Sequence, residues 1–422
     1  MFAADVCSGS SRRVPVGPAR PSPSNPSLAS PRPVRVLVVG GTGRIGTVVA
    51  AHLLLHARGR LGRRAELLLA GRDARRGREA VEEVLALVAG GCEPPLCSFR
   101  QLDWQDGAAV REAAGGCAAV VHTAGPYLDA PHTVLEAAIA RGVPVYADVG
   151  DPLEYLDAGL ELSGAAQQSG TRAVMAAGAF PGLSNLLAVE AAAQLLEASG
   201  EPVADLDFNY FTAGLGGSGE VNLLITNLGF AEDVAQFDQG RLSSQRNAGL
   251  DAHRTKFYID EDDVSFERVG EQTVWAWPFP EAATVARQLG ISGSSRVGMG
   301  TAPEIWNVMI GLLASLVPRT HAMRVDAVGE RGGRVSFIQA HDSFRQCVSG
   351  VATDEPYGLL RAKGHPLQHP SVGQSCAEFV LDMLGHRPAL YASAADRRRL
   401  LARMTSTEGT LTYRMQFVPG RA

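Results

Sequence analysis

A glycine-rich run follows the first apolar stretch of the chain and has the spacing of a phosphate-binding turn. The mainly apolar stretch Val34–Val39 leads directly into Gly40–Gly46, which contains the pattern G-x-G-x-x-G at Gly41, Gly43 and Gly46. In this pattern the first glycine permits a tight turn, the second leaves room for a pyrophosphate, and the third lets the next helix pack closely on the strand. The start of that helix offers N–H groups and the positive end of its dipole to the phosphates. The sequence therefore predicts a dinucleotide-binding turn.

The end of the next apolar stretch indicates which nicotinamide dinucleotide is bound. An acidic residue at this position would accept hydrogen bonds from the ribose 2′-OH of NAD. Here Leu67–Ala70 is followed closely by Arg72 and Asp73. Arg72 can pair with a 2′-phosphate and stack on adenine, with Arg75 or Arg76 as a second donor, although these two also fit an exposed helix face. Asp73 is better suited to cap the following helix than to bind ribose, so we expect NADP (NADPH).

Two further segments are placed to contact the cofactor, because ligands of open α/β sheets lie beyond the carboxyl ends of the strands. Asp103 follows the third predicted strand and either contacts the adenine amine or caps the next helix. The loop His122–Tyr127 follows the fourth strand, and its small residues let the backbone approach the nicotinamide ribose. The predicted cofactor-binding residues are Gly41, Thr42, Gly43, Arg44, Ile45, Gly46, Arg72, Asp103, Ala124, Gly125 and Pro126.

Proton-transfer candidates gather near the ends of the fourth and fifth strands. They are His122, Tyr127, Tyr146 and Asp148, and each of them also suits a structural or substrate-orienting role. Asp148 is the best candidate because it follows an apolar strand and precedes a glycine, and we predict Asp148, Tyr127 and His122 as catalytic residues. No tyrosine has a lysine four residues later, which argues against the Tyr-x-x-x-Lys chemistry of short-chain reductases.

Short apolar strands and amphipathic helices alternate through the first part of the chain, which is typical of a parallel sheet covered on both faces. The predicted strands are Val34–Val39, Glu66–Ala70, Cys97–Leu102, Ala118–His122, Val143–Ala147 and Arg172–Met175. The predicted helices are Ile45–Ala57, Ala74–Ala89, Asp106–Ala114, His132–Arg141 and Pro152–Ser169. The fold class expected is α/β, with a Rossmann doubly wound parallel sheet and a second α+β domain.

The regular alternation is lost after Phe180, so we expect the NADP-binding Rossmann domain over residues 34–180. An α+β substrate or dimerisation domain is expected over 181–370, and a C-terminal segment returning to the first domain over 371–422. The second part contains a turn at Gly214–Gly219, an acidic loop at Asp260–Asp263, a Trp/Pro cluster at Trp275–Pro280 and strands near Arg324–Val328 and Arg334–Gln339.

The stretch Gly178–Asn185 joins the two predicted domains. Its Gly-Pro turn fits a hinge at the rim of a cleft, and Ser184 and Asn185 fit caps for a helix that opens at Leu186. One loop can serve both purposes.

Composition excludes several classes of protein. The 422 residues are 45% apolar, enough for two cores, and a formal net charge of -5 gives no broad positive field, so nucleic acid is not an expected partner. The six cysteines form no C-x-x-C, which argues against zinc; Cys92 and Cys97 are close enough to pair, although free thiols fit better. The uncharged runs are short or carry Pro and Gly, so we expect no transmembrane segment.

The first 33 residues differ from the rest of the chain. They contain seven Ser, seven Pro and four Arg with a single acid, Asp5. Such a leader is predicted to be disordered and resembles a plastid or mitochondrial transit peptide, which points to the chloroplast; a tail without an address, in a cytoplasmic protein, is the alternative.

Several motifs in this order resemble the saccharopine dehydrogenase-like family, in its NADP-binding branch and closest to plant and cyanobacterial-type members. In the first part they are Val36–Gly46, Gly71–Asp73, His122–Tyr127, Tyr146–Pro152 and Gly178–Asn185. In the second part they are Gly214–Gly219, Gly270–Trp277, Ala302–Asn307 and Val328–Glu330.

The resemblance implies an oxidoreductase that moves a hydride between the nicotinamide and the carbon of a C=N or C–N bond, or of a C=O bond, in a small-molecule substrate. It also implies a possible homodimer. The second part of the chain shows no compact basic cluster for a substrate with several carboxylates. The alternative is a catalytically silent NADP-binding scaffold or a lipid-associated plastid protein, since no catalytic signature is present.

Overall fold

The computed structural model describes residues 32–89, 94–213, 233–245, 251–258, 270–301, 320–342, 370–386, 391, 393–405 and 414–420. All but Arg32 belong to Pro33–Ala422, which forms one compact unit. Most of the predicted leader lies outside the described residues. So do Gly214–Gly219, Asp260–Asp263, Ala302–Asn307 and Cys92.

The first part of this unit is a six-stranded sheet in the order β3-β2-β1-β4-β5-β6, with every neighbouring pair parallel. Its strands are β1 (Val34–Val39), β2 (Ala65–Gly71), β3 (Leu96–Gln101), β4 (Ala119–His122), β5 (Val145–Asp148) and β6 (Arg172–Val174). This is the predicted doubly wound sheet, and the order reverses between β1 and β4, where open α/β sheets bind ligands.

Helices cover both faces of this sheet, because its strands are apolar on both sides. They are α1 (Arg44–Leu61), α2 (Ala74–Leu87), α3 (Gly107–Ala113), α4 (Thr133–Ala140), α5 (Leu153–Leu160) and α6 (Ser163–Ser169). On one face Val38 and Leu67 share a core with Leu53 of α1. On the other, Leu37 packs in a core with Val134 of α4.

The helix predicted over Pro152–Ser169 is wrong in one respect, since the structure has two helices there. The hydroxyl of Ser163 donates to the carbonyl of Leu160 at 2.5 Å, and the N–H of Leu162 bonds to Gly159 in a tighter turn. A serine that takes a carbonyl of the preceding turn competes with the helical ladder, and here the chain starts a new helix.

The second part is a nine-stranded sheet in the order β10-β11-β12-β7-β13-β14-β15, with the β8–β9 hairpin joined to β12. The strands are β7 (Val203–Ala213), β8 (Val234–Asp238), β9 (Arg241–Gln245), β10 (Ala252–Lys256), β11 (Glu271–Ala276), β12 (Ser295–Thr301), β13 (Thr320–Gly329), β14 (Arg334–Asp342) and β15 (Arg414–Val418). All pairs are antiparallel except β12 with β7, as expected for a mainly antiparallel α+β domain.

Two helices pack on one face of this second sheet. The helices α7 (Leu183–Ser199) and α9 (Glu281–Leu289) bury Leu187 and Val285 against Phe208 and Val325 of the strands. Trp277, from the predicted Trp/Pro cluster, is 3% exposed and belongs to the same core.

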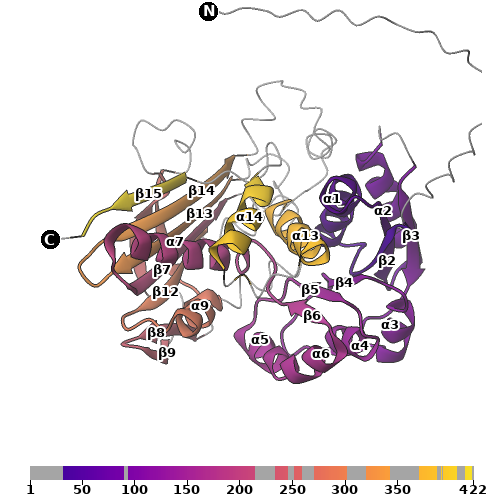
Figure 1. Ribbon diagram of the computed structural model, residues 1–422, viewed down its shortest axis with the longest axis horizontal. Coiled ribbons are helices and arrows are strands. Elements are labelled where there is room, and N and C mark those ends of the chain that lie inside the picture. The colour runs from indigo at the N-terminus through magenta and orange to yellow at the C-terminus, as the bar shows by residue number, and fades with distance from the viewer. Residues whose placement is uncertain are drawn as a thin grey trace, which may run out of the picture. The chain divides into compact units, whose positions relative to one another are not determined.

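The C-terminal residues contribute to both parts. Helix α13 (Pro370–Gly385) packs on α1 (Figure 1), and the side chain of His52 lies 2.9 Å from that of Glu378 in this contact. The contact is close, because a Cβ on Gly373 would lie 2.7 Å from Val48. Helix α14 (Ala394–Thr405) contacts α7 and α13, and β15 pairs with β14.

Candidate functional site

The glycine-rich turn after β1 depends on a left-handed residue at Gly40. Gly40 has a φ of +81°, and a Cβ there would lie 2.6 Å from the backbone nitrogen of Ala124. The turn was expected to depend on Gly41, and Gly41 also has no room for a side chain, because its Cβ would lie 2.9 Å from the carbonyl oxygen of Val38 and 3.0 Å from Leu69. The sequence analysis did not single out Gly40.

The two later glycines shape the start of α1. Gly46 lies so close to the turn that a Cβ would be 2.3 Å from the carbonyl oxygen of Gly40. Gly43 is exposed and forms the N-cap of α1, where no side chain caps the helix and the first turn contains no acidic residue. An uncapped helix start behind a glycine turn has outward-facing N–H groups and a positive dipole end, which suit a diphosphate. Thr42, Arg44 and Ile45 are half-buried around it.

The residues that were expected to determine selectivity between NADP and NAD lie at the end of β2. Asp73 caps α2 as predicted, accepting from the N–H of Arg75 at 2.8 Å and of Arg76 at 3.0 Å. The hydrogen bond from the N–H of Arg76 is the main cause of the lowered pKa of this carboxyl, and desolvation opposes it. Arg75 pairs with Glu79 along the exposed helix at 3.2 Å, which fits the exposed-face interpretation.

Arg72 is exposed and follows directly after Gly71. A Cβ on Gly71 would lie 2.9 Å from the hydroxyl of Thr42, so the end of β2 touches the glycine turn. The carbonyl of Arg72 accepts from Gln101 at 2.9 Å. Arg72 therefore lies beside the turn on a backbone that is fixed by its neighbours.

The alternative that Asp103 caps the next helix is wrong. Asp106 caps α3, accepting from the N–H of Ala108 and Ala109 at 3.0 and 3.1 Å. The exposed carboxylate of Asp103 accepts instead from the N–H of Gln105 at 3.1 Å, in a turn that precedes the helix. Its contact with adenine stays a prediction.

The loop after β4 is held against the glycine turn by hydrogen bonds to β1. The N–H and the hydroxyl of Thr123 both donate to the carbonyl of Val39, at 2.8 and 3.0 Å. Ala124 then meets Gly40, and Gly125 and Pro126 are exposed beyond it. The predicted contact residues of the two loops therefore lie side by side at the point where the strand order reverses.

His122 and Tyr127 are buried beneath this loop. The hydroxyl of Tyr127 donates to the carbonyl of His122 at 2.8 Å, and their rings meet edge to face. Burial, together with the neighbouring His132, lowers the pKa of His122 to about 3, so its ring is neutral at physiological pH. His122 and Tyr127 are only 2% and 6% exposed, so they are suited to holding the loop after β4 against the core.

Asp148 at the end of β5 is fully buried and accepts four hydrogen bonds. One oxygen accepts from the hydroxyls of Tyr146 at 3.0 Å and Tyr155 at 3.2 Å, and the other from the N–H of Gly150 at 3.1 Å and Ala176 at 3.0 Å. A carboxylate offers about four lone-pair directions, and all are used. Burial raises the pKa of Asp148 to about 6, although these bonds oppose the shift.

The three residues predicted as catalytic are therefore brought together, but as parts of one buried network. Tyr155 links them, because its ring packs against Tyr127 with centroids 5.1 Å apart and its hydroxyl bonds to Asp148. In this arrangement the network fixes the loops after β4, β5 and β6 relative to one another. Direct proton exchange with a substrate by Asp148, Tyr127 or His122 stays a prediction.

The sequence analysis missed a second buried carboxyl, Glu281 in the first turn of α9. One of its oxygens accepts from Tyr210 at 2.7 Å and from Ser184 at 3.1 Å. The other oxygen has no hydrogen-bond partner within the described part of the chain. Burial raises the pKa of Glu281 to about 7, despite the hydrogen bond from Tyr210.

The Ser184 and Asn185 pair was expected to precede a helix at Leu186, but α7 begins earlier, at Leu183. Asn185 still caps it, from inside the first turn, by accepting from the N–H of Gly182 at 3.0 Å. Ser184 binds Glu281 instead. The rim loop is thereby tied to α9.

The charge of Asp151, in the loop after β5, acts on one residue of each cluster. Burial is the main cause of the raised pKa of Tyr127 and of Glu281, and the charge of Asp151 raises both further. Asp151 is half-buried, whereas Asp148 and Glu281 are fully buried. Asp151 lies within the Tyr146–Pro152 motif, from which no role for it was predicted.

Comparison with known proteins agrees with this geometry. Residues 36–174 match the family model of the saccharopine dehydrogenase NADP binding domain. Saccharopine dehydrogenase (L-Glu forming) from Saccharomyces cerevisiae has a similar structure, with a TM-score of 0.59 at 11% identity, covering 92% of this chain and 100% of that one. Homospermidine synthase from Legionella pneumophila in complex with NAD has a TM-score of 0.56 at 9% identity, covering 91% of each chain. No curated protein sequence matches the chain.

Residues 36–174 are therefore similar to the saccharopine dehydrogenase NADP-binding domain, and the chain as a whole has a saccharopine dehydrogenase-like fold. This confirms the resemblance seen in the sequence motifs. The assignment to a plant and cyanobacterial branch stays a prediction. Within the described residues, no helix is long and apolar enough to cross a membrane.

Proposed function

We propose that this protein is an NADP-dependent oxidoreductase that transfers a hydride to or from a C=N or C–N bond, or a C=O bond, of a small molecule. The observation that carries the proposal is the glycine turn at the β1–β4 reversal. There Gly40 and Gly46 leave no room for side chains, and Gly43 opens onto an uncapped helix start. The nicotinamide, when bound, would supply or accept the hydride.

Arg72 supports NADP over NAD. The acid beside it, Asp73, accepts two backbone hydrogen bonds on one oxygen as the cap of α2, and this role fixes its side chain at the start of the helix. Arg72 is the nearby cation that can meet a 2′-phosphate with parallel N–H groups. The related homospermidine synthase structure contains NAD, so the preference of this chain needs its own measurement.

The carbon–nitrogen chemistry rests on the likeness to saccharopine dehydrogenase and homospermidine synthase. The chain's own residues are expected to have two roles, positioning of the loops and proton transfer. The Asp148 network holds the loops after β4, β5 and β6, and Asp151 and Glu281 are the acids placed to hold or exchange a proton beyond those loops.

The test has two stages. Calorimetric titration with NADPH, NADH and both oxidised forms should show NADPH bound most tightly; no binding of any form would overturn the proposal. The bound NADPH is then offered a panel of imines, aldehydes, ketones and 2-oxo acids with amines, and loss of reduced-nicotinamide absorbance is followed. Tight binding without turnover across the panel would favour the silent scaffold.

A further inference from the structure

One edge of the second sheet is apolar and exposed. The strand β15 pairs with β14 and, within the described residues, with no second strand, so it ends the sheet order (Figure 1). Met415, Phe417 and Val418 on this strand are 47%, 38% and 42% exposed. The described part of the chain has seven exposed large apolar side chains, and three of them come from this one strand of five residues. At an apolar edge of this kind another strand can add to the sheet.

The register of β14 and β15 shows that these side chains continue the core. Phe417 lies opposite Val335, and Met415 lies opposite Phe337. Residues that face each other across two strands point to the same side of the sheet. Val335 and Phe337 are each 1% exposed and belong to the core beneath α7. Met415 and Phe417 therefore extend an apolar face of the sheet beyond its helical cover.

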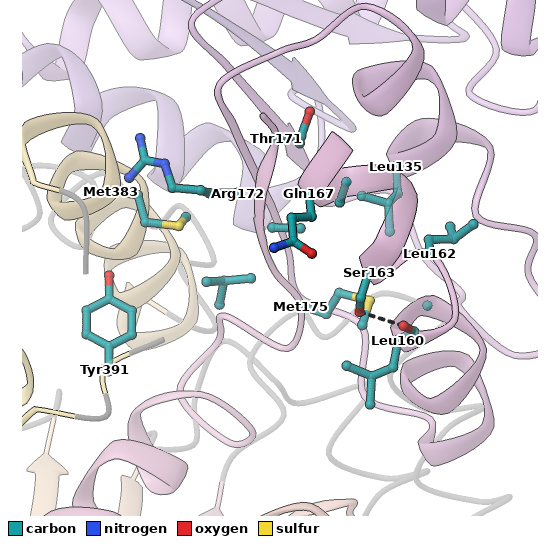
Figure 2. A pocket seen from close by; sticks show the side chains of 14 residues that line it. Leu135, Leu160, Leu162, Ser163, Gln167, Thr171, Arg172, Met175, Met383 and Tyr391 are labelled. Atoms are coloured by element: carbon teal, nitrogen blue, oxygen red, sulfur yellow. Dashed lines mark hydrogen bonds between the residues drawn. The ribbon is translucent and has the colours of Figure 1, made fainter. Parts of the chain in front are cut away.

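Two other sheet edges are protected against pairing. The edge strand β6 of the first sheet is three residues long, and side chains from α5, α6 and α13 line a cavity of about 400 Å³ beside it (Figure 2). The strand β10, at the other end of the second sheet, has the exposed charged residues Arg254 and Lys256. Short strands, covering elements and exposed charges are the means by which proteins keep edges from pairing. The strand β15 is longer than β6, and Met415–Val418 contains no charged residue.

The sequence of β15 is complementary to itself. When two copies pair antiparallel around Gln416, Met415 of each copy faces Phe417 of the other, and Arg414 faces Val418. This register uses the whole strand, brings sulfur against an aromatic ring twice, and keeps the two Arg414 positions at opposite ends of the paired segment. Gln416 lies at the centre opposite its own counterpart, and its amide can both donate and accept. A two-fold pairing of this kind closes after two copies.

We propose that the β15 edge is a homodimer interface, in which the strands of two copies pair antiparallel in the register centred on Gln416. The two nine-stranded sheets then form one continuous sheet. Five residues a side bury less surface than a standard interface, so we expect a reversible dimer with a Kd on the order of 10 μM. The strand contains none of the residues assigned to nicotinamide binding, so the dimer can fail while the proposed function stands, and the reverse holds as well.

The first experiment is analytical ultracentrifugation of the full-length protein, from about a tenth of that Kd to about ten times it. The mean mass should rise with concentration from that of one chain towards that of two. A protein that stays monomeric throughout this range would overturn the proposal and leave an extended segment of another protein as the occupant of the edge.

The second experiment tests the register with charged substitutions. Met415→Lys and Phe417→Glu should each weaken the dimer about tenfold or more, because each brings two charges against apolar side chains. In the double variant the new ammonium of each copy faces the new carboxylate of the other, so Kd should return to within about threefold of the parent. Leu242→Lys on β9 is the matched control, since Leu242 is 44% exposed, and it should leave Kd unchanged. Equal weakening by the control, or no recovery in the double variant, would contradict the assigned edge and register.

The third experiment places a cysteine at the centre of the paired segment. Opposed residues of antiparallel strands have Cα atoms roughly 4.5–5.5 Å apart, which a disulfide can span. Gln416→Cys should therefore give a linked dimer under mild oxidation, as seen by electrophoresis without reductant, and Leu242→Cys should not. A linked fraction no larger than that of the parent protein would overturn the proposal. In all these variants the circular dichroism spectrum and the denaturation midpoint should match the parent, which separates loss of pairing from loss of folding.

Discussion

The two halves of the carboxyl edge of the first sheet are built in opposite ways. At β1, β2 and β4 the surface is made by backbone and by exposed side chains, including Gly43, Arg72 and Gly125. At β5 and β6 it is made by buried side chains, with the Asp148 carboxylate saturated by four donors. The open half is accessible to solvent, and the closed half ties the loops after β4, β5 and β6 together.

The largest effect is expected from breaking the closed half. Asp148→Ala leaves the hydroxyls of Tyr146 and Tyr155 and two buried N–H groups without an acceptor, and should lower the free energy of unfolding by about 3–5 kcal/mol. Chemical denaturation followed by circular dichroism measures it. The control is Asp157→Ala, whose half-exposed pair with Arg287 should contribute no more than about 1 kcal/mol. A small loss for Asp148→Ala would mean that the network does not hold these loops.

The buried carboxyl of Glu281 should make the stability of the protein depend on pH. The folded-state pKa of Glu281 is raised from 4.5 to about 7, so folding favours its protonated form. The contribution of the protonated carboxyl to the free energy of unfolding is fully present below pH 4.5, and it is lost as the pH rises towards 7. Glu281→Gln cannot ionise, so above pH 7 the variant should be more stable than the parent by up to roughly 3 kcal/mol.

Denaturation at pH 5 and at pH 8 measures this difference. At pH 5 the gap should shrink to about 1 kcal/mol or less, because the folded carboxyl is then protonated and the unfolded one is only partly ionised beyond its pKa of 4.5. The same gap at both pH values would show that Glu281 does not titrate in this range.

A smaller loss of stability is expected at the open half, together with a loss of binding. Gly46→Ala places a Cβ 2.3 Å from the carbonyl oxygen of Gly40 and forces α1 away from the turn. Unfolding free energy should fall by about 1–3 kcal/mol, and NADPH affinity should fall more than tenfold. Gly59→Ala, in the same helix, meets nothing within 4 Å and should instead stabilise by about 0.5–1 kcal/mol. If Gly46→Ala bound NADPH as tightly as the parent protein, the glycine turn would not be the binding site of the cofactor.

Arg72 should affect selectivity with no cost in stability. Arg72→Ala should weaken NADPH by about 1.5–3 kcal/mol, roughly ten- to a hundredfold, and leave NADH nearly unchanged, because only NADPH carries the 2′-phosphate. Arg78→Ala, an exposed arginine further along α2, is the control. Equal losses for both cofactors would contradict the role assigned to Arg72.

The sequence analysis predicted the open half better than the closed half. The strands and the glycine pattern are local signals, so β1 and the turn after it were found at their observed positions, although the left-handed conformation of Gly40 was not anticipated. The Glu281 cluster could not be found in this way, because Ser184 and Tyr210 lie 97 and 71 residues from it. The break between α5 and α6 depends on a single serine hydroxyl, which helical periodicity does not detect.

The contact between α1 and α13 also bears on how the chain is made. The face of α1 that carries Val48 and His52 contacts Gly373 and Glu378 of α13, which leave the ribosome only near the end of synthesis. During synthesis the nascent dinucleotide-binding half carries an uncovered face until almost the last residues are translated. A premature stop before residue 370 would therefore release a polypeptide whose signature glycine motif is intact but whose first helix lacks its cover.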